Sequence, residues 1–488
     1  MITPAFPSLR ITADALIPEG SFAEAQAAFL RPQPDRVAGL TQLLREKNTG
    51  VVAHFYMDPE LQGVLSACDW PHIHVSDSLA MADRAIAMAD QGVRTIAVLG
   101  VDFMSENVRA MLDASGYAHI PVYRVASDPI GCSLAESAEA QAYGAYLSDA
   151  AETPRSLHVV YINTSLVTKA KAHALVPTIT CTSSNVVQTV LQAAAQVPDG
   201  HVWFGPDTYM GQNLAAMFEA LGAMTDRQIR DVHPAHDRAS IEVLRSRFHY
   251  FEQGTCIVHH MFGQEVVDTV REHYPDAFVT AHLEVPGEMF ALGLEAQRRG
   301  EGVVGSTSNI LSFVLGQVDE AIARGEGGEL RIILGTEAGM ITPIVRQVQD
   351  KLRDYTSEGG PAISVEVIFP VASEAVAQAP ESGLGIVPGV AAGEGCSTAG
   401  GCATCPFMKM NSLQALTDLL GRVDVEPDSN LVPFEPRKYT QEIRGRTAAD
   451  LGGEPILHMR AFQRAGALPK ALVDDILRRH EAQAGAPG

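Results

Sequence analysis

Val51-Val-Ala-His-Phe-Tyr-Met-Asp-Pro59 is an apolar run that ends in polar side chains, and its recurrence along the chain is the main evidence for the fold. Runs of the same kind stand at residues 158–165 and 278–286. Between them, short β-rich segments alternate with helical segments rich in Ala, Met and Leu. This alternation is typical of βαβ units in a parallel sheet.

Each of these runs is followed by two further strand-like segments in an unchanging order. The first is a short strand that turns through hydroxyl side chains into a helix, at residues 74–82, 178–187 and 303–311. The second is a strand that enters a turn near a glycine, at residues 95–104, 201–210 and 331–340. Self-similarity of this kind indicates three copies of one structural unit.

The repeats predict an α/β protein with three three-layer αβα domains, whose parallel sheets are related by a pseudo-threefold axis around a central active site. The expected parts are an irregular N-terminal lead, the three repeats, and a largely helical C-terminal extension, at residues 1–45, 46–150, 151–270, 271–420 and 421–488. The lead, with helical patches at 22–29 and 37–47, is expected to act as a cover. The third repeat carries extra material at 341–392, which includes loop-like pieces at 354–360 and 370–388. Residues 424–433 are predicted to be a linker, and Leu451-Gly-Gly453 is predicted to break a helix.

Amino-acid composition and net charge exclude several classes of protein. The chain has 488 residues, of which 46% are hydrophobic and 19% charged, as in ordinary globular domains. No window approaches 18 consecutive apolar residues and residues 1–7 do not resemble a secretory signal peptide, so we expect a cytoplasmic protein without a membrane segment. The net charge of −22 disfavours a nucleic-acid surface, because a phosphate backbone requires a basic stripe.

Each repeat ends near a cysteine. These are Cys132, Cys256 and the glycine-rich loop 393–411, which contains Cys396, Cys402 and Cys405. Strand-end faces that meet at one centre would bring together one thiolate per repeat, a set that can hold a [4Fe-4S] cluster with the fourth iron open as a Lewis acid. A zinc site with three cysteines and a set of reactive thiols are the alternatives that the residues leave open.

Several motifs resemble the quinolinate synthase family of de novo NAD biosynthesis, over residues 38–345 and 393–420. The most specific are Ala53-His-Phe-Tyr56, Gly131-Cys-Ser-Leu134, Val160-Tyr-Ile-Asn-Thr-Ser165, Ala281-His-Leu-Glu284 and Cys405-Pro-Phe-Met-Lys-Met-Asn411. The resemblance implies condensation of iminoaspartate with dihydroxyacetone phosphate to quinolinate, with loss of phosphate and two waters. It also implies a [4Fe-4S] cluster on Cys132, Cys256 and Cys405, and an aspartate-oxidising enzyme as the source of iminoaspartate.

The last cysteine loop departs from the family pattern. It reads C-x5-C-x2-C, where family members with extra cysteines often show C-x2-C-x2-C. The position directly before Pro-Phe-Met-Lys-Met-Asn favours Cys405 as the ligand, which leaves Cys396 and Cys402 spare. A redox-sensitive pair of Cys402 and Cys405 is a further hypothesis.

Polar residues alternate at the ends of the first strand of each repeat, so both members of a pair can leave the same face of the strand. The pairs are His54 with Tyr56, Tyr161 with Asn163, and His282 with Glu284. We expect His54, Tyr56 and Glu284 to be catalytic, with Glu284 as general base and the imidazole and phenol as proton carriers. Every member of these pairs except Tyr56 is also expected to bind substrate, namely His54, Tyr161, Asn163, His282 and Glu284.

Hydroxyl groups at the strand-to-helix turns can bind an anion or cap the helix. The candidates for substrate binding are Ser78, Ser183 and Thr307, and His259 is expected to reach a phosphate or carboxylate. Lys169 either supplies positive charge or is a solvated lysine. Two other functions stay open, namely another non-redox cluster dehydratase and a protein that carries a cluster without turnover.

Overall fold

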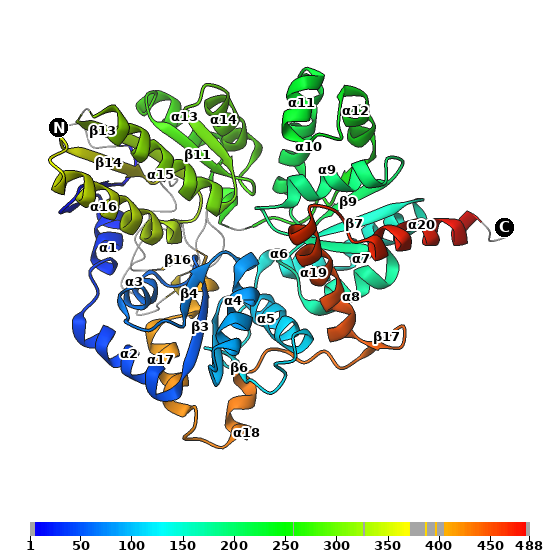
Figure 1. Ribbon diagram of the computed structural model, residues 1–488, viewed down its shortest axis with the longest axis horizontal. Helices are drawn as coiled ribbons and strands as arrows, with labels where there is room; N and C mark the ends of the chain where they lie inside the picture. The colour runs from blue at the N-terminus through cyan, green and yellow to red at the C-terminus, as the bar shows by residue number, and fades with distance from the viewer. Residues whose placement is uncertain are drawn as a thin grey trace. The chain divides into compact units, whose positions relative to one another are not determined.

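The computed structural model describes residues 5–256, 258–325, 327–370, 386–387, 396–397 and 405–484. It confirms the α/β class, with parallel sheets flanked by helices (Figure 1). The chain divides into two compact units. Unit 1 comprises residues 1–101, 119–130 and 257–435, and unit 2 comprises residues 102–118, 131–256 and 436–488.

The three main sheets share one topology, in which each begins with four parallel strands in the order second, first, third, fourth. In unit 1 the first sheet holds β3 (Thr49–His54), β4 (Ile73–Ser76), β5 (Thr95–Leu99) and β6 (Val122–Arg124). In unit 2 the sheet holds β7 (Ser156–Tyr161), β8 (Thr178–Cys181), β9 (His201–Gly205) and β10 (Phe248–Tyr250). The other sheet of unit 1 holds β11 (Phe278–His282), β12 (Gly302–Gly305), β13 (Gly328–Gly335) and β14 (Ile363–Ile368).

This common order confirms the nine strands predicted from the repeat, while the fourth strand of each sheet was missed. β6 and β10 have only three residues each, too few for an alternating pattern to emerge. Within the extra material expected at 341–392, the structure has the long helix α16 (Ile341–Ser357) and β14, and α16 covers the first part of the piece at 354–360 that we expected to be a loop. Most of the other expected loop, 370–388, lies outside the described residues. Each predicted domain, 46–150, 151–270 and 271–420, contains the four parallel strands of one main sheet, and the boundaries themselves stay a prediction.

The central strands are buried on both faces. All six residues of β3 and all six of β7 are buried. Strands covered on both faces read as continuous apolar runs rather than alternating ones. Because parallel strands all end at the same edge of a sheet, the polar residues that follow β3, β7 and β11 are placed at those edges.

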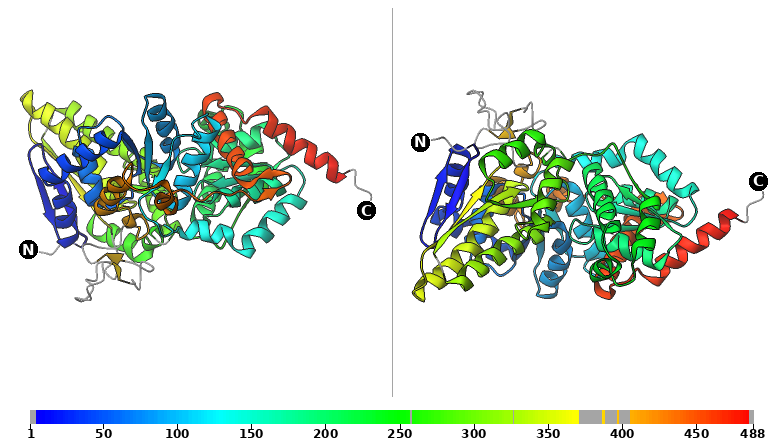
Figure 2. Two further views of the ribbon diagram at one scale, coloured as in Figure 1. Left: turned by 90° about the horizontal axis from the view of Figure 1, so that it is seen from below. Right: turned by 90° about the horizontal axis from the view of Figure 1, so that it is seen from above.

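The N-terminal lead is not irregular, which corrects our expectation. β1 (Ser8–Ile11) and β2 (Leu16–Glu19) form a hairpin that extends the larger sheet of unit 1, with β1 antiparallel to β14 (Figure 2, blue strands). Leu9 and Ile11 are fully buried there. The helical patches are confirmed as α1 (Ser21–Phe29) and α2 (Pro34–Lys47).

The helices after the cysteine loop are only partly as predicted. In unit 1, α17 (Leu413–Arg422) is confirmed, and the expected linker contains the short helix α18 (Asp428–Leu431). In unit 2, α19 (Ala448–Ala465) runs through the expected break without interruption and is followed by α20 (Lys470–Ala484). Across the described parts of the chain, no helix combines the length and apolarity that a membrane crossing requires.

Close packing explains the glycine pair in α19. This helix packs against α8 (Leu166–Leu175). A Cβ at Gly452 would lie 2.2 Å from the carbonyl oxygen of Leu166, whereas a Cβ at Gly453 would meet only the Met111 Cε at 3.8 Å. Gly452 is therefore required by the approach of the two helices, and Gly453 is not.

The two neighbouring glycines form a matched test of this packing. Gly452→Ala should lower the free energy of unfolding by about 1–3 kcal/mol, because the backbone of α8 must move away. Gly453→Ala should be neutral or stabilising by up to about 1 kcal/mol, since alanine favours a helix interior. Chemical denaturation of the two variants measures both effects, and equal destabilisation by both would contradict the packing argument.

Candidate functional site

Two histidines in unit 1 are held in the same way at the ends of two strands. The Nδ1 atom of His54, at the end of β3, accepts the backbone N–H of Tyr56 at 3.2 Å. The Nδ1 atom of His282, at the end of β11, accepts the backbone N–H of Glu284 at 3.3 Å. An imidazole nitrogen that accepts a hydrogen bond carries no proton, so each neutral ring has its proton on Nε2.

Burial keeps both rings neutral. Desolvation lowers the pKa of His54 to about 4, although Asp77 and Glu284 raise it in part. Desolvation likewise lowers the pKa of His282 to about 4, with a partial offset from Glu284. Both side chains are therefore Nε2–H donors at neutral pH, able to donate to a substrate oxygen without bringing in a positive charge.

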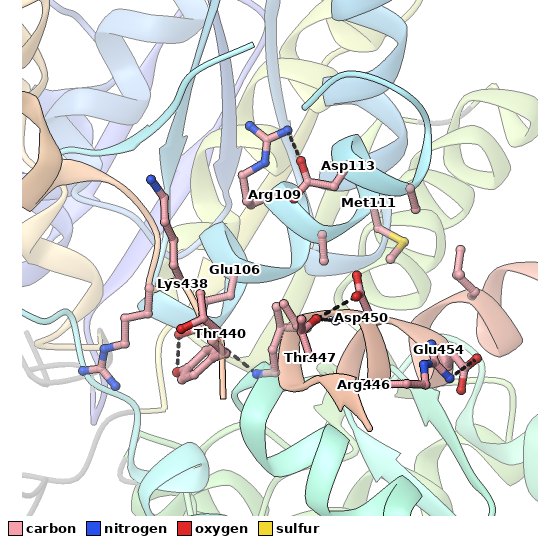
Figure 3. A pocket seen from close by; sticks show the side chains of 18 residues that line it. Glu106, Arg109, Met111, Asp113, Lys438, Thr440, Arg446, Thr447, Asp450 and Glu454 are labelled. Atoms are coloured by element: carbon pink, nitrogen blue, oxygen red, sulfur yellow. Dashed lines mark hydrogen bonds and ion pairs between the residues drawn. The ribbon is translucent and has the colours of Figure 1, made fainter. Parts of the chain in front are cut away.

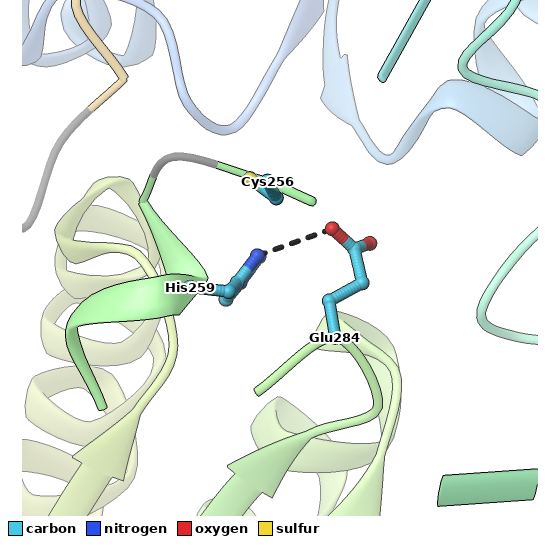
Figure 4. A group of neighbouring side chains, drawn as sticks. All are labelled: Cys256, His259 and Glu284. Carbon is cyan, nitrogen blue, oxygen red and sulfur yellow. Dashed lines mark ion pairs between the residues drawn. The ribbon is translucent and has the colours of Figure 1, made fainter. Parts of the chain in front are cut away.

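Glu284 faces His259 (Figure 4), and its Oε1 atom is 3.6 Å from Nδ1 of His282. Its Oε2 atom is 3.1 Å from Nδ1 of His259, and the His259 ring stacks on that of His282 with centroids 4.9 Å apart. Nδ1 of His259 faces this carboxylate, whereas its buried Nε2 atom has no hydrogen-bond or ion-pair partner among the described residues. Buried polar atoms without a partner are uncommon and point to a ligand. Cys256, drawn with them, precedes His259 by three residues in the sequence.

Tyr56 extends this group toward β13. Its ring centroid is 4.6 Å from that of His54, and its phenol oxygen is 3.2 Å from Oγ1 of Thr336. The approach of the two strand ends depends on Gly339, because a Cβ there would lie 2.2 Å from the carbonyl oxygen of Phe55. The ends of β3, β11 and β13 thus contribute to one group of polar side chains in unit 1.

The segment 405–411 is fixed at both ends inside unit 1. Glu337 accepts the backbone N–H of Cys405 at 3.2 Å and that of Gly339 at 2.8 Å, and its burial raises the pKa of this carboxyl to about 8. Asn411 is fully buried; its Oδ1 accepts the N–H of Gly100 at 2.9 Å, and its Nδ2 donates to the carbonyl of Met408 at 3.0 Å. No role was predicted for Glu337, Thr336 or Asn411 from the sequence, although an acidic residue directly after a predicted strand was a usable signal for Glu337.

Unit 2 holds the two other predicted cysteine ligands. Cys132 is the residue before α6 (Ser133–Glu139), and both Cys132 and Cys256 are partly exposed. The hydroxyl of Ser133 donates to the carbonyl of Thr255 at 3.1 Å. Because Cys132 precedes Ser133 and Cys256 follows Thr255, this hydrogen bond brings the backbone segments of the two cysteines together. Cys396 lies in the short strand β16 (Cys396–Ser397), and Cys402 falls outside the described residues.

The predicted substrate residues of unit 2 follow β7 and β8. Tyr161, at the end of β7, is 5% exposed, and Asn163 and Ser183 are partly exposed. Lys169 is not a solvated lysine, because it is fully buried and donates to the carbonyl of Ile162 at 3.1 Å. Desolvation lowers the pKa of this lysine to about 7, although Glu106 raises it in part.

The hydroxyls predicted at two helix starts in unit 1 are not the capping groups. Asp77 accepts the N–H of Ala80 at the start of α4 (Ser78–Asp90), and Ser306 caps α15 (Thr307–Arg324) in a capping box. Ser78 and Thr307 each occupy the first helical position instead. Capping therefore does not account for these two hydroxyls, and a role in anion binding stays a prediction.

Comparison with known proteins identifies the family. A family model described as Quinolinate synthetase A protein matches residues 38–363. The chain is 56% identical over 484 residues to a chloroplastic quinolinate synthase of Nicotiana tabacum, which covers 97% of this chain and 67% of that protein. The chain belongs to the quinolinate synthase family.

Other relatives agree with this membership and make the chain an enzyme of the quinolinate synthase kind. It is 53% identical over 487 residues to the chloroplastic quinolinate synthase of Arabidopsis thaliana, with 97% of this chain and 67% of that protein covered. It is 26% identical over 418 residues to a quinolinate synthase of Thermosynechococcus vestitus, with 84% of this chain and 97% of that protein covered. The chain spans about two thirds of the length of the plant relatives.

The predicted cytoplasmic location is wrong in the light of these relatives. Four quinolinate synthases from plants, 52–56% identical to this chain, are named chloroplastic. The prediction tested residues 1–7 only for a secretory signal peptide, a pattern that differs from a plastid transit peptide.

The shared tautomer of His54 and His282 is directly measurable. In ¹⁵N spectra of protein labelled at histidine, both rings should be in the Nε2–H form and should stay neutral to about pH 4. Between the unfolded value of 6.5 and about 4 the native rings bind fewer protons than the unfolded chain, so they make the protein less stable as the pH falls through this window. His54→Asn and His282→Asn assign the signals, and titration of either ring near pH 6.5 would contradict the geometry.

Proposed function

We propose that this chain condenses iminoaspartate with dihydroxyacetone phosphate to give quinolinate, phosphate and two waters. The observation that carries the proposal is the group of polar side chains at the ends of β3 and β11 in unit 1. There, two neutral Nε2–H imidazoles accompany a buried carboxylate and a phenol, from His54, His282, Glu284 and Tyr56. Membership of the quinolinate synthase family supports the same reaction.

We assign a [4Fe-4S] cluster to the thiolates of Cys132, Cys256 and Cys405. The donor set fits such a cluster, because thiolates are soft ligands and all three side chains are partly exposed. By contrast, burial raises the pKa of the Cys181 thiol well above its usual value, which makes that residue a poor ligand. When bound, the cluster supplies an open iron site that acts as a Lewis acid toward a substrate oxygen or nitrogen.

Glu284 is the proposed general base. It is 5% exposed, and its Oε2 atom adjoins His259, so a proton that it accepts can be shared with the imidazole. The condensation requires removal of a proton next to a carbonyl, and a carboxylate withdrawn from water is suited to that step. His259 and His282, stacked against each other, restrict where this carboxylate can move.

Tyr56 and His54 are the proposed proton donors. The Nε2–H group of His54 can donate to a carbonyl or phosphate oxygen, because its Nδ1 is occupied by the backbone of Tyr56. The phenol of Tyr56 can protonate a departing hydroxide during loss of water, and Thr336 holds its oxygen in place. Both groups act without a full positive charge.

Binding of the substrate anions is assigned to hydroxyl, amide and imidazole groups. Ser78 and Thr307 stand at the first positions of α4 and α15, where backbone N–H groups also favour anions. The other residues proposed to bind the substrates are His259 and, in unit 2, Tyr161, Asn163 and Ser183. Iminoaspartate would be supplied by an enzyme that oxidises aspartate.

The cluster assignment is tested by replacing one thiol at a time. After anaerobic reconstitution, Cys132→Ser, Cys256→Ser and Cys405→Ser should each lose the brown colour and most of their iron and sulfide. Cys68→Ser, a partly buried cysteine outside the proposed set, is the control and should retain both. A colourless wild-type protein with stoichiometric zinc would overturn the assignment.

The role of Tyr56 is tested separately from the cluster. Tyr56→Phe should keep the colour and the iron content but lower the rate of quinolinate formation by about 10²–10⁴-fold, the usual contribution of a general acid. Thr336→Val, which leaves the phenol but removes its hydroxyl neighbour, should lower the rate less. Full activity of Tyr56→Phe would refute the proton-donor role.

A further inference from the structure

A cavity of about 360 Å³ lies within unit 2, where the last turn of α8 adjoins α19, α20 and the hairpin of β17 (Glu442–Ile443) and β18 (Arg446–Thr447). Its volume is in the range of small-molecule sites. Its arginines and carboxylates are Arg444, Arg446, Arg478, Arg479, Glu454 and Asp475. Four positive and two negative groups leave an excess of two positive charges, in a chain whose net charge is −22.

Arg479 and Asp475 hold α20 against the end of α8. Asp475 accepts from Arg478 at 2.6 Å and from Arg479 at 2.7 Å. Arg479 also donates to the carbonyls of His173 and Ala174, at the end of α8. Arg479 thus joins α20 to the last turn of α8, and a positive charge is favourable at that helix end.

The second carboxylate is also occupied. Glu454 lies 3.1 Å from Nε2 of His173 and 2.8 Å from Nη1 of Arg446. The hydrogen bond with His173 and the pairing with Arg446 lower the pKa of Glu454 to about 2, so this group is ionised at neutral pH. Neither carboxylate is left to neutralise a further cation.

The Arg446–Glu454 pair also lines a neighbouring cavity of about 550 Å³ (Figure 3). That cavity has four cations and four carboxylates among its lining residues. Its balanced charge gives no preference for the sign of a ligand. Of these two cavities, only the smaller one therefore has an excess of positive charge.

Arg444 carries one of the two excess charges, and the other arises because Arg478 and Arg479 share the single carboxylate of Asp475. It occupies the two-residue turn between β17 and β18 with φ of 52°, a left-handed conformation that glycine adopts more readily. Its side chain is exposed and, within the described part of the chain, has no ion-pair or hydrogen-bond partner. A guanidinium group has five N–H donors in a planar fork that matches carboxylate and phosphate oxygens.

We propose that the smaller cavity binds a small dianion, either a phosphate or a dicarboxylate. Arg444 supplies a positive charge that no carboxylate offsets among the described residues, and Arg446 and Arg478 supply N–H donors beyond those that face Glu454 and Asp475. The site is separate from the proposed catalytic group, because none of its residues belongs to the catalytic or cluster-binding set. The proposal therefore stands or falls independently of the reaction.

Isothermal titration of the full chain tests the site, with inorganic phosphate and malonate as separate probes at constant ionic strength. Wild-type protein should show saturable binding of at least one probe, and Arg444→Gly should weaken it by about tenfold through loss of a charge-assisted contact. Glycine is chosen because it favours the left-handed turn, so the hairpin is retained. Arg444→Lys, which keeps the charge but not the planar fork, should bind with intermediate affinity.

Arg464→Ala is the matched control, because Arg464 is exposed in the last turn of α19 and does not line the cavity. Its titrations should match those of the wild type. Phosphate that binds at the catalytic group would be insensitive to Arg444→Gly, so only the component that this variant removes is assigned to the cavity. The probe that loses this component identifies the dianion, and identical isotherms for wild type and Arg444→Gly with both probes would overturn the proposal.

Discussion

A hydrogen bond from a backbone N–H to the Nδ1 atom of an imidazole determines which atom two histidines of unit 1 offer as a donor. It occurs at His54 and again at His282, each time from the residue two positions later in the chain. The bond fixes the ring, sets the tautomer and leaves Nε2–H as the donor. Since it is made by the backbone just after a strand, the register of the sheet itself controls which atom is offered to a ligand.

The same constraint explains which features of the unit 1 histidines could be predicted from the sequence and which could not. Continuous apolar runs revealed the first three strands of each sheet, and the alternation after them placed His54 with Tyr56 and His282 with Glu284 at strand ends. Tautomers and pKa values could not follow from the sequence, because they depend on burial and on which backbone N–H faces each ring. The short strands β6 and β10 carry too few residues to give a periodic signal.

Contacts between distant segments account for the other differences. The hairpin β1–β2 was read as irregular because its partner β14 lies more than 300 positions later, and two four-residue strands have little pattern of their own. Leu451-Gly-Gly453 was read as a break because glycine is unfavourable in a helix, whereas the approach of α8 requires Gly452. Likewise, Glu337 and Asn411 gain their roles only when the segment 405–411 folds against the ends of β13 and β5.

The two proposed anion sites, one in each unit, differ in the groups that they would offer to an anion in a chain of net charge −22. At the strand ends of unit 1 the available groups are neutral imidazoles, hydroxyls and backbone N–H groups, which stabilise negative charge without holding it as tightly as a fixed cation would. This suits a reaction in which charge must move and products must leave. In the cavity of unit 2 the groups are arginines, one of them without a carboxylate partner among the described residues. A permanent cation favours retention of an anion rather than its conversion. The groups of unit 1 therefore suit the catalytic role proposed for them, and the arginines of unit 2 suit the binding role proposed for the cavity.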